Sequence, residues 1–370
     1  MRTLIAGGGT GGHLTPALAV ALALRDAAPE GEVVVVGRRD GVAERLVVAA
    51  GLRLETLDVS GVDVRSPGGI ARATTQLTGA TMAARRLLRR MRPDVVVGAG
   101  GYVSVPVVVA ALAQRIPVVL LEQNAVPGRA TRLLARRARV VAASFTETAR
   151  YLPHARVVHT GNPVRAEVRA VSPRPIGDRL RQVLVTGGSQ GARRLNRAIT
   201  GCVVALLNDD PDLSVVHQCG SLDHEMVARA AGALPPALAS RYTVSPFFDD
   251  MAVRMAQSDL VVMRAGGSSI AECSALGRPM IVVPYPHAGG HQRHNVSPYV
   301  EAGAAMLIDD ADCTPERLGA EIRALVAAPV RWRRMSEASA ALGRPDATDA
   351  VVELIVEAAG PGPNRRSDAA

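Results

Sequence analysis

Short apolar runs alternate along most of the chain with longer segments in which apolar residues recur every three or four positions. The short runs are rich in valine and are typical of strands buried on both faces of a parallel sheet. The longer segments have the periodicity of helices that cover such a sheet. The pattern therefore predicts an α/β fold. Strands are expected at residues 2–6, 32–36, 94–98, 117–121, 139–143, 182–186, 213–217, 242–245, 259–263, 279–284 and 305–308.

The alternation breaks between residues 160 and 180, where several prolines interrupt it. Such a break is typical of a domain boundary. We therefore predict two Rossmann-like, doubly wound parallel-sheet domains that face each other across a cleft, at residues 1–162 and 163–345. The strand at 139–143 is expected to complete the first sheet. A last helix over 346–358 is expected to pack back on the first domain, and the tail 359–370 to be disordered.

Glycine-rich turns follow several of the expected strands, with the sequences GGGTGGH (7–13), GAGGYVSVP (98–106), GGSQGA (187–192) and RAGGSS (264–269). Glycine lets the backbone approach a ligand closely, and a helix that starts behind the turn presents N–H groups to an anion such as phosphate. The first helix is expected to start with Thr15 as N-cap and Pro16 at its first position. Ser268 and Ser269 are expected to cap the helix after the last turn.

Glu272 lies one turn inside that last helix. Its carboxylate either closes a capping box or accepts hydrogen bonds from a diol such as a ribose. The first turn formally matches the dinucleotide fingerprint, but Gly37, Arg38 and Arg39 stand where the acidic residue after the second strand is required. A dinucleotide is therefore not predicted.

The composition narrows the class of ligand. The net charge is +9 and all 43 basic residues are arginine, so the chain attracts an acidic partner and cannot use Schiff-base or P-loop lysine chemistry. Aromatic residues make up only 2% of the chain, too few for base-stacking platforms, so no nucleic-acid partner is expected. The four cysteines have no CxxC spacing, and neither a secretory signal nor a membrane span is predicted.

Two segments leave alternatives open. Residues 64–92 predict a helix with Leu77, Thr81, Ala84, Leu88 and Met91 on one face and arginines crowding its end. It is either a crossover helix with a solvated basic face or a contact surface for anionic lipid headgroups. His287, His291 and His294 suggest a metal site only if 287 and 291 share a helix face. The surrounding proline- and glycine-rich loop argues against that helix, so no metal site is predicted.

The motifs GGGTGGH, GGYVS, EQN, GNPVR, GGSQGAR, FFDDM and RAGGSSIAE with HQRHN occur in this order over nearly the whole chain. Together they resemble the MurG family, the bacterial N-acetylglucosaminyltransferases that make lipid II from lipid I in peptidoglycan synthesis. The resemblance implies a GT-B fold and an inverting, metal-independent transfer from UDP-GlcNAc, without a cofactor. The acceptor is the 4-hydroxyl of MurNAc-(pentapeptide)-pyrophosphoryl-undecaprenol. The implied location is peripheral, on the anionic cytoplasmic face of the cell membrane.

The resemblance also implies roles for single residues. His13 is the candidate base that removes the acceptor proton, which suits an imidazole that titrates near neutral pH. Glu272 is expected to bind the ribose and Gln292 the sugar hydroxyls. The full set of expected UDP-GlcNAc-binding residues is Thr10, Gly11, Gly12, Asn124, Arg165, Ser189, Phe248, Gly267, Ser268, Ser269, Glu272 and Gln292.

One departure from the family pattern keeps other functions open. His291 precedes Gln292 where the family usually has a GlnGln or GluGln pair. A related GT-B glycosyltransferase with another sugar nucleotide or acceptor, as in natural-product glycosylation, would also fit this sequence. A UDP-sugar epimerase on the same fold is a further alternative. A basic nucleic-acid-binding protein is supported by the charge alone.

Overall fold

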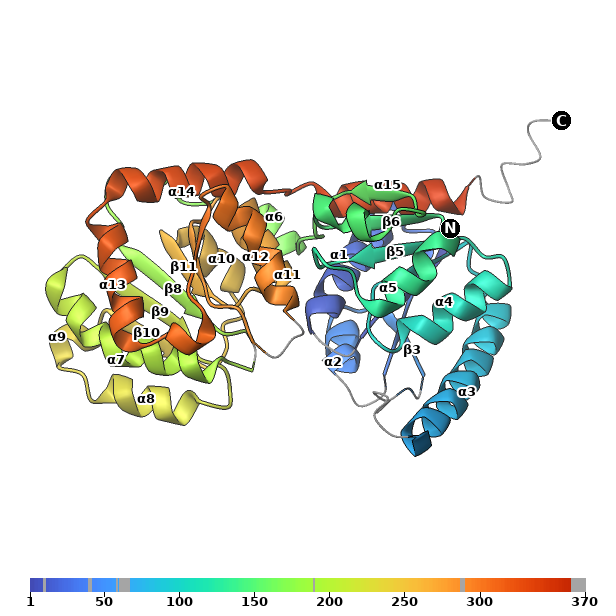
Figure 1. The fold of residues 1–370 in the computed structure, drawn as a ribbon, viewed down its shortest axis with the longest axis horizontal. Helices are drawn as coiled ribbons and strands as arrows, with labels where there is room; N and C mark the ends of the chain where they lie inside the picture. The colour runs from blue at the N-terminus through green and yellow to red at the C-terminus, as the bar shows by residue number, and fades with distance from the viewer. Residues whose placement is uncertain are drawn as a thin grey trace. The chain divides into compact units, whose positions relative to one another are not determined.

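A computed structural model of the chain describes residues 1–8, 11–38, 42–57, 59, 67–188, 190–286 and 290–360. The chain forms two compact units (Figure 1). Unit 1 comprises Met1–Arg165 and Asp346–Ala370, and unit 2 comprises Ala166–Pro345. Each unit contains one parallel sheet, of seven strands in unit 1 and six in unit 2. The α/β class with two doubly wound parallel sheets, predicted from the hydrophobic pattern, is confirmed.

The sheet of unit 1 has the strand order β3-β2-β1-β4-β5-β6-β7. The order reverses between β1 and β4, because β1 leads outward to β2 and β3 on one side and β4 begins the other side. Such a reversal is the topological switch point of a doubly wound sheet. The strands are β1 Arg2–Ala6, β2 Glu32–Gly37, β3 Arg53–Thr56, β4 Val95–Gly98, β5 Val118–Glu122, β6 Val140–Ala143 and β7 Val157–His159.

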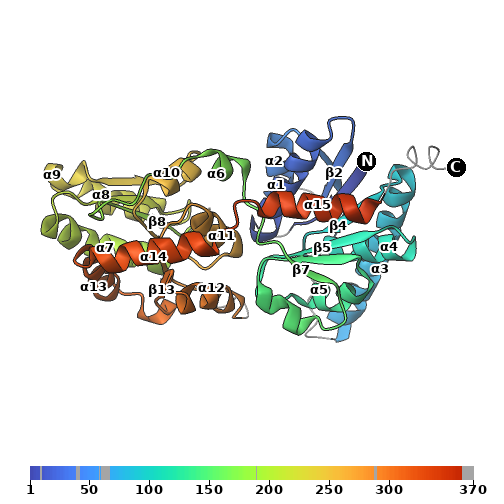
Figure 2. The ribbon, with the colours of Figure 1, turned by 90° about the horizontal axis from the view of Figure 1, so that it is seen from above.

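Alternate residues of these strands pack on opposite faces, as the two-residue period of a strand requires. Leu4 and Ala6 belong to the buried cluster on one face of the sheet, whereas Ile5 belongs to the cluster on the other face. Figure 2 shows helix α15 (Ala347–Ala359) lying over this sheet, where it contacts β4, β5 and β6. The helices of unit 1 are α1 Gly11–Ala27, α2 Val42–Ala49, α3 Pro67–Met91, α4 Ser104–Ala113, α5 Arg129–Leu134, η1 Ala135–Arg137, η2 Thr146–Tyr151 and α15 Ala347–Ala359.

Two expectations for unit 1 were wrong at its margins. The sheet does not end at residues 139–143, because β7 follows at one edge, and β3 forms the other edge. Neither edge strand has a fully buried residue, so neither carries the apolar run of a central strand. Helix α1 begins at Gly11, before the expected Thr15 cap, and Pro16 lies inside it. Pro16 removes one helical N–H near the start, where the remaining turns keep the helix intact.

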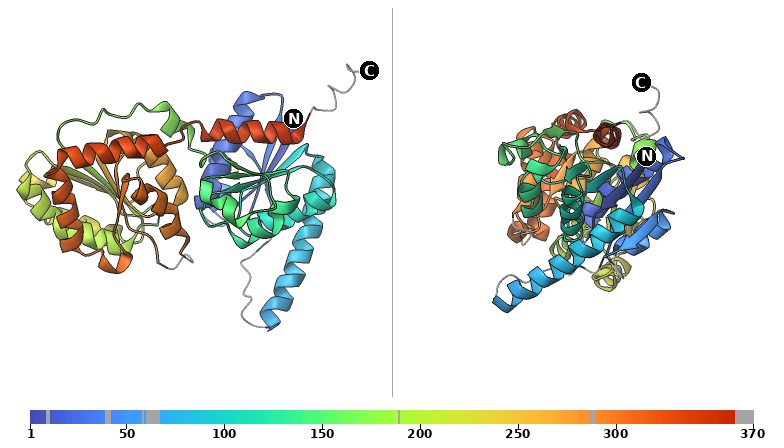
Figure 3. Two further views of the ribbon diagram at one scale, coloured as in Figure 1. Left: turned by 45° about the horizontal axis from the view of Figure 1, so that its top comes forward. Right: turned by 90° about the vertical axis from the view of Figure 1, so that its right-hand side faces the viewer.

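The residues expected on one face of the long helix α3 are not all buried. Ala84, Leu88 and Met91 are buried, but the side chain of Leu77 remains 41% exposed. The reason is geometric, since α3 has 25 residues and its partner α4 has only 10. Figure 3 shows the first turns of α3 extending beyond the other helices of unit 1. Within the described residues, no helix is both long enough and apolar enough to cross a membrane.

Unit 2 repeats the architecture with the strand order β10-β9-β8-β11-β12-β13, so its switch point lies between β8 and β11. The strands are β8 Gln182–Thr186, β9 Ser214–Gln218, β10 Tyr242–Ser245, β11 Leu260–Met263, β12 Met280–Val282 and β13 Ala305–Leu307. The helices are α6 Ala166–Ala170, α7 Arg193–Asp209, α8 His224–Gly232, α9 Pro236–Ala239, α10 Met251–Gln257, α11 Gly267–Ala275, α12 His291–Glu301, η3 Asp310–Asp312, α13 Pro315–Val326 and α14 Pro329–Leu342.

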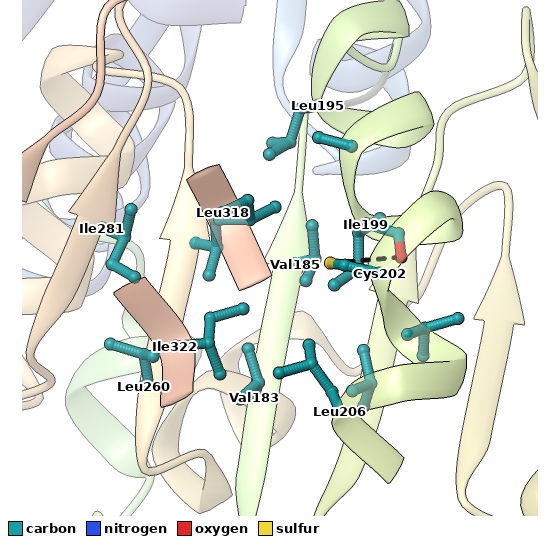
Figure 4. Close-up of a cluster of buried hydrophobic side chains, with 14 of the residues drawn as sticks. Val183, Val185, Leu195, Ile199, Cys202, Leu206, Leu260, Ile281, Leu318 and Ile322 are labelled. Carbon is teal, nitrogen blue, oxygen red and sulfur yellow. Dashed lines mark hydrogen bonds between the residues drawn. The ribbon is translucent and has the colours of Figure 1, made fainter. Parts of the chain in front are cut away.

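The core of unit 2 lies between its sheet and the helices α7 and α13 (Figure 4). Val183 and Val185 of the central strand β8 meet Ile199 of α7 in this cluster. Cys202 is part of it, and its thiol donates to the carbonyl of Ile199 over 3.6 Å. Burial raises the pKa of Cys202 to about 12, so this cysteine is a packing residue rather than a nucleophile.

Candidate functional site

The four glycine-rich turns all lie at the two switch points. In unit 1, one turn follows β1 and another follows β4; in unit 2, one follows β8 and another follows β11. Ligands of open α/β sheets bind outside the carboxyl ends of the strands at such a point. The topology therefore gathers the motifs identified in the sequence at one sheet edge in each unit.

The turn after β4 packs tightly against the turn after β1. A Cβ atom on Gly101 would lie 1.8 Å from the carbonyl oxygen of Gly8, and Gly101 has a φ of +78°. A Cβ atom on Gly100 would lie 2.8 Å from Nδ1 of His13, and Gly100 has a φ of +92°. Only glycine combines this backbone conformation with this close approach. The two glycines thus bring the backbone after β4 directly against the His13 ring.

His13 lies in the first turn of α1 and is half-buried. Its Nδ1 is 2.9 Å from Oε1 of Gln123, and Nε2 of Gln123 donates to the carbonyl oxygen of Ala99 over 3.1 Å. Within the described part of the chain, Nε2 of His13 makes no hydrogen bond. Gln123 is only 4% exposed and follows β5 directly. The sequence analysis did not single it out, although its EQN motif stands at the carboxyl end of an expected strand.

Glu122 organises the rest of the EQN loop. Its buried carboxylate accepts hydrogen bonds from the backbone N–H and side-chain amide of Asn124, both at 3.1 Å. It also accepts from the N–H of Gly128 at 3.1 Å and the hydroxyl of Thr131 at 2.6 Å. Asn124, an expected donor-binding residue, therefore uses its amide N–H within this loop. The carboxylate of Glu122 shapes the backbone next to Gln123.

In unit 2, the N-terminus of α11 lies at the switch point. Gly266 is its N-cap without a side-chain bond, so the expected capping by Ser268 and Ser269 was wrong. The helix begins at Gly267, which places both serines inside the first turn. The N–H of Ile270 donates the first hydrogen bond of the helix, to the carbonyl of Gly266. The N–H groups of Gly267, Ser268 and Ser269 come before this bond and therefore have no acceptor within the helix. Glu272 is also in α11 and is 6% exposed.

A second amide side chain joins three strand ends of unit 2. Gln218, at the end of β9, accepts from the N–H of Phe248 over 3.0 Å and donates to the hydroxyl of Thr186 over 3.3 Å. The ring of Phe248 is buried, with the guanidinium of Arg254 3.9 Å from its centroid. Phe248 was an expected site residue, and this contact fixes its backbone at the carboxyl edge of the sheet. Gln218 and Thr186 were not identified from the sequence.

The segment His291–Asn295 was expected to be a loop and is the start of α12. Gly290, with a φ of +76°, precedes it and allows the chain to turn into the helix. Gln292 of this first turn accepts a hydrogen bond from the N–H of Tyr285 over 2.8 Å. Arg293 forms an ion pair with Asp309 beyond β13. These two contacts hold the start of α12 against the carboxyl edge of the sheet.

Arg264, the residue directly after β11, is fixed in place. Its guanidinium donates to the carboxylate of Asp310 over 2.6 Å and to the carbonyl of Val283 over 3.1 Å. Arg194 at the start of α7 reaches the same carboxylate at 3.4 Å. Asp310 therefore connects segments that follow β8, β11 and β13. The sequence analysis did not identify this cluster.

The remaining expected residues are placed as follows. Gly12 is exposed in the first turn of α1, and Arg165 is half-buried at the end of the first segment of unit 1. Thr10 and Ser189 lie outside the described residues, as does His287 of the rejected metal site. The described residues contain no group of three or more His, Cys, Asp or Glu side chains arranged to hold a metal ion.

Comparisons with known proteins identify both halves of the chain. Residues 3–143 match the glycosyltransferase family 28 N-terminal domain, and residues 182–351 match the family 28 C-terminal domain. A relative from Anaeromyxobacter dehalogenans (strain 2CP-1) is 39% identical, with 96% of this chain and 93% of the relative covered. One from Desulforudis audaxviator (strain MP104C) is also 39% identical, over 98% of this chain and 100% of the relative.

Both relatives are named UDP-N-acetylglucosamine–N-acetylmuramyl-(pentapeptide) pyrophosphoryl-undecaprenol N-acetylglucosamine transferase. Among solved structures, the chain is similar to the crystal structure of Acinetobacter baumannii MurG. The TM-score is 0.74 with 30% identity, over 96% of this chain and 98% of that one. The two parallel sheets of this chain accordingly form a GT-B fold. The chain belongs to the MurG family of glycosyltransferases, within glycosyltransferase family 28.

Proposed function

We propose that this chain transfers N-acetylglucosamine from UDP-N-acetylglucosamine to the 4-hydroxyl of MurNAc-(pentapeptide)-pyrophosphoryl-undecaprenol, with inversion and without a metal. The product is the lipid II precursor of peptidoglycan. One observation carries the proposal: relatives named for this reaction are 39% identical over nearly the whole of both chains. An identity spread over both units covers the segments that would bind donor and acceptor.

In this reaction the acceptor oxygen attacks C1 of the sugar from the face opposite UDP. The new bond joins that oxygen to C1, the bond from C1 to the phosphate oxygen breaks, and UDP leaves with the electron pair. The acceptor hydroxyl loses its proton to a base, for which we propose Nε2 of His13. The support is its half-buried position at the switch point of unit 1, with Nδ1 already engaged by Gln123.

Unit 2 would bind the donor. The first turn of α11, from Gly267 to Ser269, presents N–H groups that precede the helical ladder, and such groups stabilise an anion without a metal. We propose that they bind the pyrophosphate, that Glu272 accepts from the ribose hydroxyls, and that Gln292 contacts the sugar. Because the side-chain oxygen of Gln292 accepts from Tyr285, its NH₂ group is the part that would donate to a sugar oxygen.

The other expected donor contacts remain proposals, namely Thr10, Gly11, Gly12, Asn124, Arg165, Ser189 and Phe248. Asn124 already donates to Glu122 and the ring of Phe248 is buried, so we propose that these two residues contact the donor through the backbone or the remaining side-chain face. A matched pair of variants tests the donor site. Glu272→Gln should raise the Kd for UDP-GlcNAc by roughly tenfold to a hundredfold, whereas exposed Glu301→Gln should not change it.

The transfer assay tests the proposal directly. With UDP-GlcNAc and a lipid I analogue, we expect a disaccharide product whose formation persists in excess EDTA. Absence of transfer by a protein that still binds UDP would refute the proposed acceptor. Competition among UDP-GlcNAc, UDP-GalNAc and UDP-glucose separates this function from a related glycosyltransferase, which would prefer another donor. Consumption of UDP-GlcNAc without any acceptor would instead indicate an epimerase.

We further propose that unit 1 contacts an anionic membrane surface, where the lipid-linked acceptor is anchored. Helix α3 supports this, since Arg85, Arg86 and Arg89 are exposed on it and form no ion pair with a described residue. Leu77 and Met82 of the same helix are 41% and 50% exposed. A helix with exposed apolar side chains beside arginines suits the interface of an anionic bilayer.

Vesicle binding tests this surface. Each arginine near an anionic surface contributes about 1 kcal/mol, so reversing Arg85, Arg86 and Arg89 to Glu should weaken binding to phosphatidylglycerol vesicles by roughly a hundredfold. The control reverses Arg331, Arg333 and Arg334, three exposed arginines of α14 in unit 2, so both variants change the net charge by the same amount. Equal losses in both variants would indicate attraction by net charge and contradict a defined surface on α3.

A further inference from the structure

We propose that Gln123 is a positioning residue that keeps a proton on Nδ1 of His13 and thereby leaves the lone pair of the neutral ring on Nε2. The final step, that Nε2 then acts as the base, rests on the proposed function. The assignment of the proton does not, because it follows from hydrogen-bond geometry alone.

The carbonyl oxygen of Ala99 can only accept a hydrogen bond. The end of the Gln123 amide that lies 3.1 Å from this oxygen must therefore be the NH₂ group. The other end, 2.9 Å from Nδ1 of His13, is then the amide oxygen, which can also only accept. Two acceptors cannot share a hydrogen bond, so Nδ1 of His13 must carry the hydrogen.

The surroundings hold this arrangement in place. Gln123 is 4% exposed, and its backbone continues from β5, whose last residue Glu122 is held by the hydrogen bonds of the EQN loop. On the other side, the backbone of Gly100 lies so close that a Cβ atom there would reach the His13 ring at 2.8 Å. The ring therefore has little room to rotate away from the Gln123 oxygen.

The position of the proton matters for proton transfer. A neutral imidazole accepts a proton only at the nitrogen without hydrogen, and the hydrogen bond of one nitrogen selects the role of the other. When Nε2 takes a proton, the ring becomes a cation and its Nδ1–H bond to the Gln123 oxygen becomes charge-assisted and stronger. The neutral amide of Gln123 thus orients the His13 ring and stabilises its cation without adding a second titrating group.

A second histidine in the same chain supplies an internal reference. Asn196 donates from its NH₂ group to the carbonyl of Cys219 over 2.8 Å, so its oxygen faces Nε2 of His217 at 3.0 Å. Nε2 of His217 must then carry the hydrogen, and its Nδ1 accepts from the hydroxyl of Tyr242 at 2.8 Å. The geometry therefore assigns opposite tautomers to His13 and His217.

Nitrogen-15 NMR of the full chain, labelled at histidine, tests the assignment without any substitution. We expect His13 as the Nδ1–H tautomer and His217 as the Nε2–H tautomer, each signal identified by its loss in the corresponding variant. An Nε2–H tautomer at His13 in the unmodified protein would overturn the proposal, whatever its activity.

Two variants then test whether Gln123 is responsible. Gln123→Met removes the acceptor, so both tautomers of His13 should become populated and turnover should fall by roughly tenfold to a hundredfold. Gln123→Glu keeps an acceptor oxygen for Nδ1 of His13 but loses the NH₂ group that donates to the carbonyl of Ala99. It should therefore be less stable than the unmodified protein, retain the Nδ1–H tautomer and exceed the Met variant in turnover. The control is Gln114→Met, since Gln114 donates to the carbonyl of Ala110 on α4 and forms no hydrogen bond with a histidine among the described residues.

The outcomes separate this proposal from the proposed function. A His13 tautomer that is unchanged in Gln123→Met would overturn the role of Gln123, even if turnover falls. A tautomer that changes while the unmodified protein fails to transfer GlcNAc would leave the assignment intact and refute only the function. If the Met variant does not fold, the measurement on the unmodified chain and on Gln123→Glu still decides the assignment.

Discussion

His13 in unit 1 and His217 in unit 2 are each held by a side-chain amide that is itself bonded to a backbone carbonyl, but the two rings differ in burial and in the use of their second nitrogen. Each ring nitrogen that carries hydrogen donates to a side-chain amide, from Gln123 or Asn196, whose NH₂ group is fixed by a backbone carbonyl. His217 is fully buried and its other nitrogen accepts from Tyr242. His13 is half-buried, and its other nitrogen bonds to no described residue.

The comparison indicates which contacts distinguish the structural histidine His217 from His13, the proposed base. Burial lowers the pKa of His217 to about 4, so the ring is neutral at physiological pH and both of its nitrogens are used within the fold. Burial also raises the pKa of Tyr242, which therefore remains a hydrogen-bond donor. An anchoring amide alone does not make a base. The second nitrogen must also face a substrate.

The first prediction concerns the removal of His13, the proposed base. His13→Ala should lower turnover by roughly a hundredfold to ten-thousandfold, because general base catalysis contributes about that much. UDP-GlcNAc affinity and thermal stability should change little, since the ring makes one side-chain hydrogen bond. Kinetics, calorimetric titration and thermal unfolding measure the three quantities. Exposed His154→Ala is the control, and equal activity of the two variants would contradict a catalytic role for His13.

The second prediction removes the structural member. His217→Leu leaves the Tyr242 hydroxyl and the Asn196 oxygen without their buried partner, at a cost of about 1–3 kcal/mol for each unpaired group. We expect the unfolding free energy of unit 2 to fall by roughly 3 kcal/mol. Turnover measured well below the unfolding temperature should remain near that of the unmodified protein. A large loss of turnover in a folded His217→Leu variant would contradict a purely structural role for His217.

The third prediction concerns pH. An unfolded histidine titrates near 6.5 and folded His217 near 4, so between these values the unfolded state binds more protons. The stability contributed by neutral His217 is therefore complete above pH 6.5 and is lost as the pH falls towards 4. The slope approaches about 1.4 kcal/mol per pH unit. Denaturant unfolding at several pH values should show this component in the unmodified protein and not in His217→Leu.

The fourth prediction alters the backbone beside His13. Gly100→Ala places a Cβ atom 2.8 Å from the ring at a φ of +92°, which should cost about 1–3 kcal/mol and displace the imidazole. Gly79→Ala is the matched control, because Gly79 lies within α3 with nothing within 4 Å of its Cβ position. The control should gain up to about 1 kcal/mol. Measurements of thermal unfolding and turnover distinguish the two variants. A Gly100→Ala variant with unchanged stability and turnover would contradict the confinement of the His13 ring by Gly100.

Much of the fold could be predicted because its central strands are buried on both faces. Runs such as VVVG and VVLL read as strands wherever both faces of the sheet are covered, which holds for β4 and β5. The edge strands β3 and β7 were missed because their outward positions need no apolar residue. The start of α12 was missed because its proline- and glycine-rich approach resembles a loop, whereas Gly290 only turns the chain into the helix.

The site was partly predictable for a similar reason. Glycines with positive φ and the His13 motif leave a local signature in the sequence, so their turns were identified. The role of Gln123 depends on the carbonyl of Ala99, which lies 24 residues earlier in the chain. Arg264 likewise depends on Asp310, 46 residues later. A single sequence does not record such pairings, because each requires the sheet to bring two strand ends together.

Helix α15 has a consequence for how the protein is made. Val351 and Ile355 of this helix are fully buried against the face of unit 1 that also receives α1. The sheet of unit 1 leaves the ribosome before unit 2, but α15, one of its covering helices, leaves only after the whole of unit 2. Until then the apolar side of β4, β5 and β6 lacks this cover. During synthesis, unit 2 can therefore form its core while unit 1 still lacks α15.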